Sequence, residues 1–125
     1  MKQNLFDING YVVVITGGTG VLGRTIAKYL AGQGAKVAIL GRKEDVGNSI
    51  VEEITSAGGE ASFYKTDVMN KETLEQNRAD ILARYGKVDT LLNAAGGNMK
   101  GATIGPDQNF FDLDPAQFQT VLNLN

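Results

Sequence analysis

The sequence predicts an α/β fold in which a parallel sheet is wound on both faces by helices, giving three layers. Short β-branched, apolar runs alternate along the chain with stretches whose apolar residues recur at helical spacing. Strands that alternate with helices of this length form βαβ units, and right-handed crossovers make the resulting sheet parallel. The chain has no internal repeat and no linker, and 125 residues are enough for one domain with a hydrophobic core.

Four strands and three intervening helices follow from the pattern. The strand-like runs are Tyr11–Ile15, Lys36–Leu40, Ala61–Lys65 and Val88–Asn93. Each helix shows one apolar stripe of the kind that packs on a sheet. The stripes consist of Val21, Leu22, Ile26, Ala27, Leu30 and Ala31; of Ile50, Val51, Ile54 and Ala57; and of Leu74, Ile81, Leu82 and Tyr85. Helix ends are expected at Gly34, at Gly58-Gly59 and at Gly86, because glycine favours the C-terminal cap.

A polar, glycine-rich loop follows the fourth strand, from Gly96 to Leu113, and a further helix is expected after it. Asp114 suits the N-cap, Pro115 suits the first turn, and Gln117 stands three residues beyond the cap. The apolar face of this helix is still continuing at Asn125, so we expect the chain to be truncated.

Composition excludes several classes of function. A formal net charge of −2 gives no basic surface for nucleic acid. The absence of cysteine and histidine excludes disulfides, thiolate chemistry, the usual zinc sites and histidine-based triads, so no metal site is expected. No apolar run approaches membrane-spanning length, and Met1–Leu5 lacks the apolar region of a signal peptide. We therefore expect a cytoplasmic protein with neither nucleic-acid nor membrane partners.

The first strand leads directly into a glycine-rich turn, Gly18-x-Gly20-x-x-Gly23, which opens the first helix. This strand–turn–helix context is the one that a dinucleotide-binding fingerprint requires. Glycines let the backbone turn sharply and approach a pyrophosphate, and the N–H groups of the helix N-terminus hold the anion. The segment therefore predicts a dinucleotide site.

Two other interpretations of the same turn remain open. The segment Gly18–Thr25 departs from a Walker A phosphate loop at one position, because Arg24 stands where that motif has lysine. The bulky guanidinium is a poor substitute for the compact charge that reaches the β- and γ-phosphates. The turn also fits a purely structural strand–helix connection without a ligand.

Three further segments agree with the glycine turn. Thr66-Asp67-Val68 follows the third strand, Asn93-Ala94-Ala95-Gly96 follows the fourth, and Val121–Asn125 lies in the last helix. Together with Thr16–Gly23, which has the spacing T-G-x-x-G-x-x-G, they resemble the N-terminal half of the short-chain dehydrogenase/reductase family. The resemblance covers nearly all of the 125 residues. It implies a Rossmann-type doubly wound sheet in which residues 1–125 are the NAD(P)-binding half of a longer domain.

The resemblance also assigns roles to individual residues. Asp67 and Val68 correspond to an adenine-contacting pair, and Asn125 corresponds to the asparagine of the catalytic tetrad. Ala94 replaces the second asparagine of the family's Asn-Asn-Ala-Gly segment. The full set of expected cofactor-binding residues is Gly17, Gly18, Thr19, Gly20, Val21, Leu22, Gly23, Arg42, Asp67, Val68, Asn93, Ala94 and Gly96.

Taken singly, Asp67 also fits a turn aspartate, and Asn93 fits a residue that satisfies the backbone at a strand end. All the strand-following segments, however, lie at the carboxyl ends of parallel strands, where open α/β sheets bind ligands. The conjunction therefore favours a binding site over separate structural roles.

The implied activity is hydride transfer between a nicotinamide and a small carbonyl or alcohol substrate, by a protein that is a homo-oligomer when full length. The family's Tyr-x-x-x-Lys pair is absent, because none of the four tyrosines has lysine four positions later. That acid–base chemistry is expected beyond residue 125, and this chain alone is expected to be inactive.

The residues after the second strand favour NADP, with NAD as the alternative. Gly41 stands where the family's NAD-binding aspartate would be, and the guanidinium of Arg42 suits a 2′-phosphate. Glu44 and Asp45 are close enough to oppose this preference, and Arg42 also fits a solvated surface charge.

The segments Ala94–Asn98 and Phe110–Pro115 resemble the D-mannonate oxidoreductases of the family, which implies a sugar acid such as D-mannonate or D-fructuronate as substrate. Two alternatives remain: a 3-oxoacyl or sugar-alcohol reductase, and a non-catalytic dinucleotide-binding module. Asn125 favours an enzyme, because a binding module has no need of a tetrad asparagine.

Overall fold

The computed structural model describes residues 4–125. Met1–Gln3, part of the N-terminal segment considered above as unlike a signal peptide, lie outside the described residues. The chain divides into two compact units, the first ending at Ala94 and the second comprising Ala95–Asn125. Within residues 4–125, no helix combines the length and the apolar character needed to cross a bilayer.

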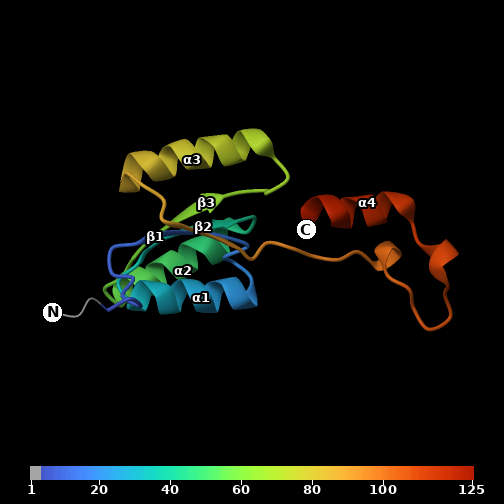
Figure 1. Cartoon of the computed structure of the whole chain (residues 1–125), viewed down its shortest axis with the longest axis horizontal. Coiled ribbons are helices and arrows are strands. Elements are labelled where there is room, and N and C mark those ends of the chain that lie inside the picture. Colours follow the sequence, from blue (N-terminus) through green and yellow to red (C-terminus); the bar gives the residue numbers. More distant parts are fainter. Residues whose placement is uncertain (1–3) are drawn as a thin grey trace. The chain divides into compact units, whose positions relative to one another are not determined.

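The first unit is a four-stranded parallel sheet with the strand order β3-β2-β1-β4. The strands are β1 (Val12–Thr16), β2 (Lys36–Gly41), β3 (Glu60–Lys65) and β4 (Thr90–Asn93). The helices are α1 (Val21–Gly32), α2 (Glu44–Ser56) and α3 (Lys71–Tyr85). Helices α1 and α2 cover one face and α3 lies on the other (Figure 1). The predicted doubly wound α/β fold is therefore confirmed.

The strand order explains which helix lies on which face. The chain moves outward from β1 through β2 to β3 and then returns to place β4 on the other side of β1. Because parallel crossovers are right-handed, a reversal of direction in the sheet moves the connecting helix to the opposite face. Helix α3 makes that return connection and lies opposite α1 and α2.

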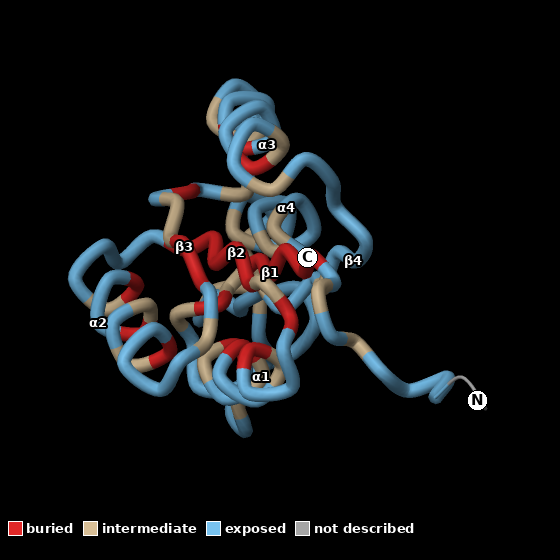
Figure 2. Tube along the Cα trace, turned by 90° about the vertical axis from the view of Figure 1, so that its left-hand side faces the viewer, coloured by how far each residue is buried: buried red, intermediate tan, exposed pale blue. Residues whose placement is uncertain are grey.

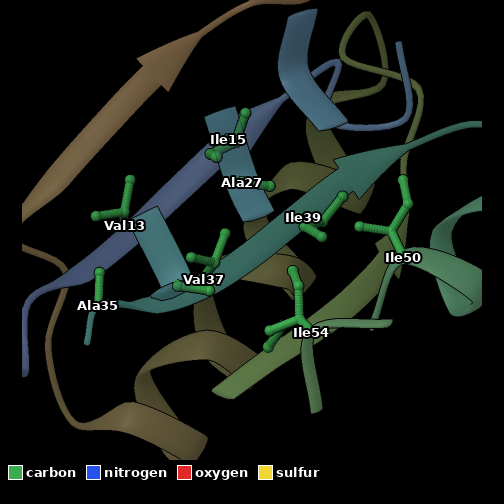
Figure 3. Close-up of a cluster of buried hydrophobic side chains, with 10 residues drawn as sticks. Val13, Ile15, Ala27, Ala35, Val37, Ile39, Ile50 and Ile54 are labelled. Carbon is green, nitrogen blue, oxygen red and sulfur yellow. The ribbon is translucent and has the colours of Figure 1, made fainter. Parts of the chain in front are cut away.

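The main hydrophobic core lies between the sheet and the helices α1 and α2 (Figure 3). Alternate residues of β1 face opposite sides, so Val13 and Ile15 enter this core while Val14 joins a smaller cluster with Ile81 of α3. All five residues of β1 are buried, which accounts for the continuous apolar run of a strand covered on both faces. Figure 2 shows the buried residues concentrated along the central strands and on the inner sides of the helices.

The predicted helix ends agree with the backbone geometry. Gly86 is the left-handed C-cap of α3, and Gly34 and Gly58 also adopt positive φ just beyond the C-caps of α1 and α2. In contrast, β4 begins at Thr90, two residues later than the predicted Val88.

The turn before β4 explains this shorter strand. The carboxylate of Asp89 accepts a hydrogen bond from the backbone N–H of Val12 at 2.8 Å and pairs with Lys87 at 2.8 Å. The hydrogen bond from Lys87 is the largest cause that lowers the pKa of Asp89, and the hydrogen bond from the backbone of Val12 is the second. The N–H of Asp89 also donates to the carbonyl of Val12 at 2.9 Å, so Asp89 holds the beginning of β1 through both its backbone and its side chain.

The second unit contains two short 3-10 turns, Lys100–Ala102 and Phe110–Asp112, followed by α4 (Pro115–Leu124). The side chain of Asp114 accepts hydrogen bonds from the N–H groups of Ala116 and Gln117, as predicted for an N-cap. The turn at Phe110–Asp112 has a capping box of its own. The side chain of Asn109 accepts a hydrogen bond from the N–H of Phe111, and the carboxylate of Asp112 accepts one from the N–H of Asn109.

Candidate functional site

The first unit brings most of the predicted site residues to one edge of its sheet. In the strand register, Thr16 is the partner of Leu40 on one side and of Asn93 on the other. Gly41 is likewise the partner of Lys65. The segments that follow the four strands therefore meet at the carboxyl edge, where open α/β sheets bind ligands.

The glycine turn joins β1 to α1 through a tightly bonded backbone. Gly17 has φ of +66°, a conformation that favours glycine. The N–H of Gly18 donates to the carbonyl of Leu40 at 3.2 Å, and that of Gly20 donates to Gly17 at 3.1 Å. A Cβ on Gly18 would lie 2.7 Å from Cγ2 of Ile39, so a side chain at this position has no room beneath the turn.

Gly23 lets α1 pack against this turn at backbone distance. A Cβ at this position would lie 2.4 Å from the carbonyl oxygen of Gly17 and 2.8 Å from Cα of Gly18. Both neighbours are backbone atoms, which cannot rotate away as a flexible side chain can. The third glycine of the motif is therefore required by the close approach of the helix to the turn that follows β1.

The N-terminus of α1 has no side-chain cap. Its N-cap is Gly20, and the first helical residues, Val21 and Leu22, are 86% and 75% exposed. The amides of a first helical turn have no acceptor within the helix, and they form the positive end of its dipole. The turn thus presents N–H groups and partial positive charge to an anion.

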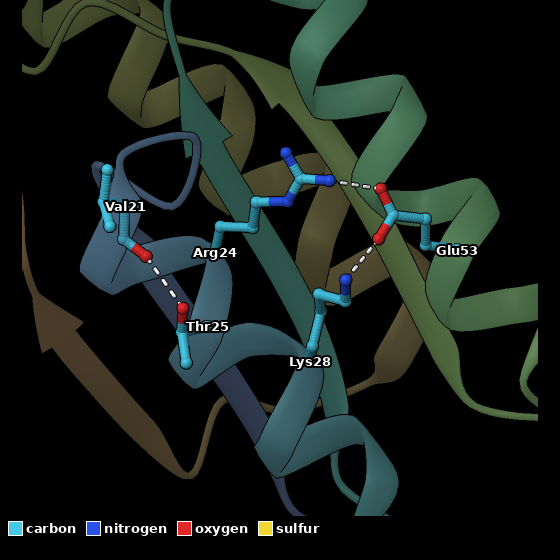
Figure 4. Close-up of polar contacts among 5 residues, drawn as sticks. All are labelled: Val21, Arg24, Thr25, Lys28 and Glu53. Atoms are coloured by element: carbon cyan, nitrogen blue, oxygen red, sulfur yellow. Dashed lines mark hydrogen bonds and ion pairs between the residues drawn. The ribbon is translucent and has the colours of Figure 1, made fainter.

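The residues that a Walker A motif would use are engaged elsewhere (Figure 4). Arg24 and Lys28 of α1 both form ion pairs with Glu53 of α2. The hydrogen bond from Lys28 is the largest influence that lowers the pKa of Glu53. The hydroxyl of Thr25 donates to the carbonyl of Val21 at 3.0 Å. The two ion pairs join α1 to α2, the bond of Thr25 stays within α1, and all three argue against the phosphate-loop interpretation.

Thr19 lies against the end of β2. A Cβ on Gly41 would lie 2.6 Å from Cγ2 and 2.7 Å from Oγ1 of Thr19, so the threonine occupies the space that a side chain at position 41 would need. Arg42 follows on an exposed bend. Among the ion pairs of residues 4–125, none involves Arg42. Its guanidinium therefore remains available for an anionic ligand.

Asp67 shapes the turn between β3 and α3. Its carboxylate accepts a hydrogen bond from the N–H of Met69 at 2.9 Å, and its carbonyl accepts one from Asn70 at 3.0 Å. The structural interpretation of Asp67 as a turn residue therefore holds, but its side chain is also exposed at the carboxyl edge beside half-buried Val68. The two roles are compatible.

Asn93 and Ala94 complete the edge on the other side of β1. Asn93 ends β4, and the N–H of Ala94 donates to the carbonyl of Thr16 at 3.1 Å. This bond continues the ladder one residue past the strand.

In the second unit, Asn125 lies against Gly96 and Gly97. Its side-chain amide donates to the carbonyl of Gly97 at 2.8 Å and accepts from the N–H of Gly97 at 3.3 Å. A Cβ on Gly96 would lie 2.7 Å from Oδ1 of Asn125, so glycine is needed for this approach. The two predicted site residues of this unit, Gly96 and Asn125, are thus in contact.

One buried residue at the carboxyl edge has no place in the motifs discussed above. Asn77 of α3 is 6% exposed and donates from Nδ2 to the hydroxyl of Thr66 at 2.6 Å. The available signal is its spacing, because Leu74, Asn77, Ile81 and Tyr85 follow one another at three or four residues along a single helix face. A polar residue at a core position needs a partner.

The sequence family model for short chain dehydrogenases matches residues 11–125. The chain belongs to this family.

Several relatives are similar over nearly the whole chain. The uncharacterized oxidoreductase UxuB of Bacillus subtilis is 43% identical over 127 residues, which cover 95% of this chain and 46% of UxuB. A 3beta-hydroxysteroid dehydrogenase of Mediterraneibacter gnavus is 32% identical over 114 residues, covering 91% and 39% of the two chains. The chain thus spans about half the length of the curated relatives it matches, or less.

Solved structures agree with this membership. A Haemophilus protein provisionally named as a D-mannonate oxidoreductase, with bound NAD, has a TM-score of 0.85 at 33% identity. The similarity covers 94% of this chain and 46% of that one. A metagenomic short-chain oxidoreductase in complex with NADP has a TM-score of 0.80 at 29% identity, covering 93% and 50%.

Proposed function

We propose that this chain forms the cofactor-binding part of an NAD(P)-dependent oxidoreductase of the short-chain dehydrogenase type. The observation that carries the proposal is the glycine turn after β1, against which Gly23 of α1 packs at backbone distance, together with the absence of a side-chain cap at the N-terminus of α1. Such a turn brings amides close to a pyrophosphate without a side chain in between. Two similar solved proteins hold NAD and NADP, which supports a nicotinamide dinucleotide as the ligand.

The predicted site residues of each unit have proposed roles toward this cofactor. The amides of Val21–Gly23 bind the pyrophosphate, Asp67 and Val68 contact the adenine, and Arg42 binds a 2′-phosphate. For Asn93, Ala94 and Gly96 the proposed role is toward the nicotinamide half, and for Asn125 it is membership of the catalytic group. When bound, the cofactor supplies or accepts the hydride exchanged with a carbonyl or alcohol substrate.

Within this function we propose that NADP is preferred over NAD. Arg42 is exposed and free of ion pairs within the described part of the chain, and Gly41 adds no carboxylate that would repel a 2′-phosphate. Titration of the full-length gene product with NADPH and NADH tests this. Removing a charge-assisted hydrogen bond weakens binding by roughly tenfold or more, so Arg42→Ala is expected to lose that much affinity for NADPH alone.

The matched control is Lys43→Ala, which removes the adjacent exposed cation. It is expected to change NADPH affinity less than twofold, because a general loss of positive charge has only a screened effect. Equal or tighter binding of NADH by the unaltered protein contradicts the preference.

For the substrate, we propose a sugar acid. The loop between Gly97 and Asn109 is rich in polar residues, which suits a polyol acid better than a steroid or an acyl chain, and the Haemophilus neighbour bears the name of a D-mannonate oxidoreductase. Oxidation of NADPH with D-fructuronate, a 3-oxoacyl thioester and simple ketoses separates the candidates. Activity on the thioester or the ketoses, with none on sugar acids, would favour the alternative reductases.

Residues 1–125 alone are proposed to be inactive, because none of their four tyrosines has a lysine four positions later to lower its pKa. Turnover by this segment at the rate of the full-length gene product contradicts that proposal. Tight NADPH binding by the full-length product without turnover of any carbonyl would instead favour a non-catalytic dinucleotide-binding module.

A further inference from the structure

Asn77 is a buried amide on the face of α3 that packs against the sheet. Its neighbours along that face are apolar or aromatic, with Ile81 buried and Leu74 packed against the same cluster. Burying an amide costs free energy unless it is hydrogen-bonded. An apolar residue would fill this position without that cost, so the amide has a role beyond filling space.

The amide begins a short network that crosses from α3 to two strands. Asn77 donates to Oγ1 of Thr66 at 2.6 Å, and that hydroxyl donates onward to the carbonyl of Tyr64 at 2.8 Å. The backbone N–H of Thr66 donates to the carbonyl of Gly41 at 2.7 Å. Thr66 is itself 2% exposed, so these bonds are shielded from water.

Thr66 therefore stands between two parts of the proposed cofactor site. Through its backbone it holds the end of β2, directly before Arg42, and in the sequence it directly precedes Asp67 and Val68. These are the residues assigned above to the 2′-phosphate and the adenine. A shift of Thr66 moves both parts together.

We propose that Asn77 is a positioning residue for the adenosine half of the cofactor, acting through the hydroxyl of Thr66. The inference rests on the proposed function, because it needs a dinucleotide at this edge. It predicts that loss of the Asn77–Thr66 bond weakens the adenine half of binding and spares the nicotinamide half.

The chain contains a matched control for a merely structural effect. Tyr85 of α3 and Ser62 of β3 form a second polar contact, between α3 and the strand that leads to Thr66, with their hydroxyls 2.8 Å apart. Ser62 lies four residues before Thr66, or roughly 13 Å back along an extended chain. Removing this contact loosens α3 from β3 at a distance from the carboxyl edge.

The test uses the full-length gene product and two halves of the cofactor as probes. Calorimetry measures ADP-ribose binding, and fluorescence measures reduced nicotinamide mononucleotide. We expect Asn77→Leu and Thr66→Val each to weaken ADP-ribose binding about five- to tenfold, the effect of one hydrogen bond, with less than a twofold change for the mononucleotide. The double variant is expected to be no weaker than either single one, because both remove the same bond.

Two further variants separate positioning from stability. Thr66→Ser keeps the hydroxyl and is expected to retain ADP-ribose affinity, whereas Tyr85→Phe is expected to lower the Tm and leave that affinity unchanged. If Asn77→Leu does not fold, Thr66→Val carries the test, since it keeps the shape of the side chain and leaves α3 unaltered.

Three results would overturn the inference: wild-type ADP-ribose affinity in Thr66→Val and Asn77→Leu, equal weakening of both probes, or an equal loss in Tyr85→Phe. Failure of the unaltered protein to bind ADP-ribose at all would instead overturn the proposed function, and with it the positioning role.

Discussion

Replacing Gly23 by alanine tests whether the approach of α1 to the turn after β1 depends on the absence of a side chain at this position. The new Cβ would lie 2.4 Å from the carbonyl oxygen of Gly17, about 1 Å closer than ordinary contact. That carbonyl cannot retreat freely, because it also accepts the N–H of Gly20. The helix must therefore rise by about 1 Å, which loosens the packing of Ala27 in the core.

Overpacking of this kind costs about 1–3 kcal/mol, and the upper end applies here because the obstructing atoms are backbone. For a chain of this size we expect the Tm to fall by about 10 °C. Thermal unfolding followed by circular dichroism measures the change, and dinucleotide affinity is expected to fall with it.

Gly32→Ala is the matched control, because it makes the same substitution in the same helix. A Cβ on Gly32 meets nothing within 4 Å. Alanine favours helix over glycine by up to about 1 kcal/mol, so this variant is expected to be more stable than the unaltered protein. A Gly23→Ala protein that melts within 2 °C of the wild type, or an equal fall in Gly32→Ala, would refute the steric reasoning.

Two other changes have defined outcomes. Gly41→Asp is expected to weaken binding of both NADPH and NADH, because the new side chain displaces Thr19. Combining it with Thr19→Ala is expected to recover NADH binding. Unimpaired NADH binding by the single variant would show that the clash is unimportant. The contacts of Asp89 with Lys87 and with the N–H of Val12 lower the pKa of the Asp89 carboxyl group. The stability that these contacts contribute is therefore present above the ordinary pKa of about 3.9 and is lost as the pH falls through the lowered native value. Urea unfolding of wild type and Asp89→Asn is therefore expected to differ at pH 6 and to converge as the pH falls through the lowered pKa of Asp89, and a difference that is constant with pH would contradict this role.

The order of elements follows from sequence pattern because each strand is a continuous apolar run and each helix carries one stripe. The ends of elements are less predictable where a side chain replaces a backbone partner. The pattern cannot distinguish Val88 from a strand residue, since the bond from Val12 to Asp89 exists only after β1 and β4 are paired. In the loop, the spacing of Asn109 and Asp112 is a capping signal that the sequence does contain.

The candidate site shows the same division. The glycine spacing predicts the turn, because the residues that would clash there are close together in the sequence and their glycines form a recognisable motif. Contacts between distant residues leave no such pattern: the packing of Thr19 over Gly41 joins a turn to the end of β2, and the bond from Asn77 to Thr66 joins α3 to the residue after β3. Both contacts form only after the right-handed crossover connections have placed these elements beside one another.

The helices of this chain begin in different ways. Asn70 and Asp114 cap α3 and α4 with their own side chains, whereas the N-caps of α1 and α2, Gly20 and Lys43, make no such bond, and Gly20 has no side chain to make one. Under the proposed function, the pyrophosphate of the cofactor accepts the hydrogen bonds that a capping side chain would accept at the N-terminus of α1. A ligand present at 100 times its Kd adds about 2.7 kcal/mol to the stability of the folded state, a large share of what a small domain possesses. The lifetime of this protein in a cell would then follow the supply of its cofactor, with the empty form being the one exposed to unfolding and proteolysis.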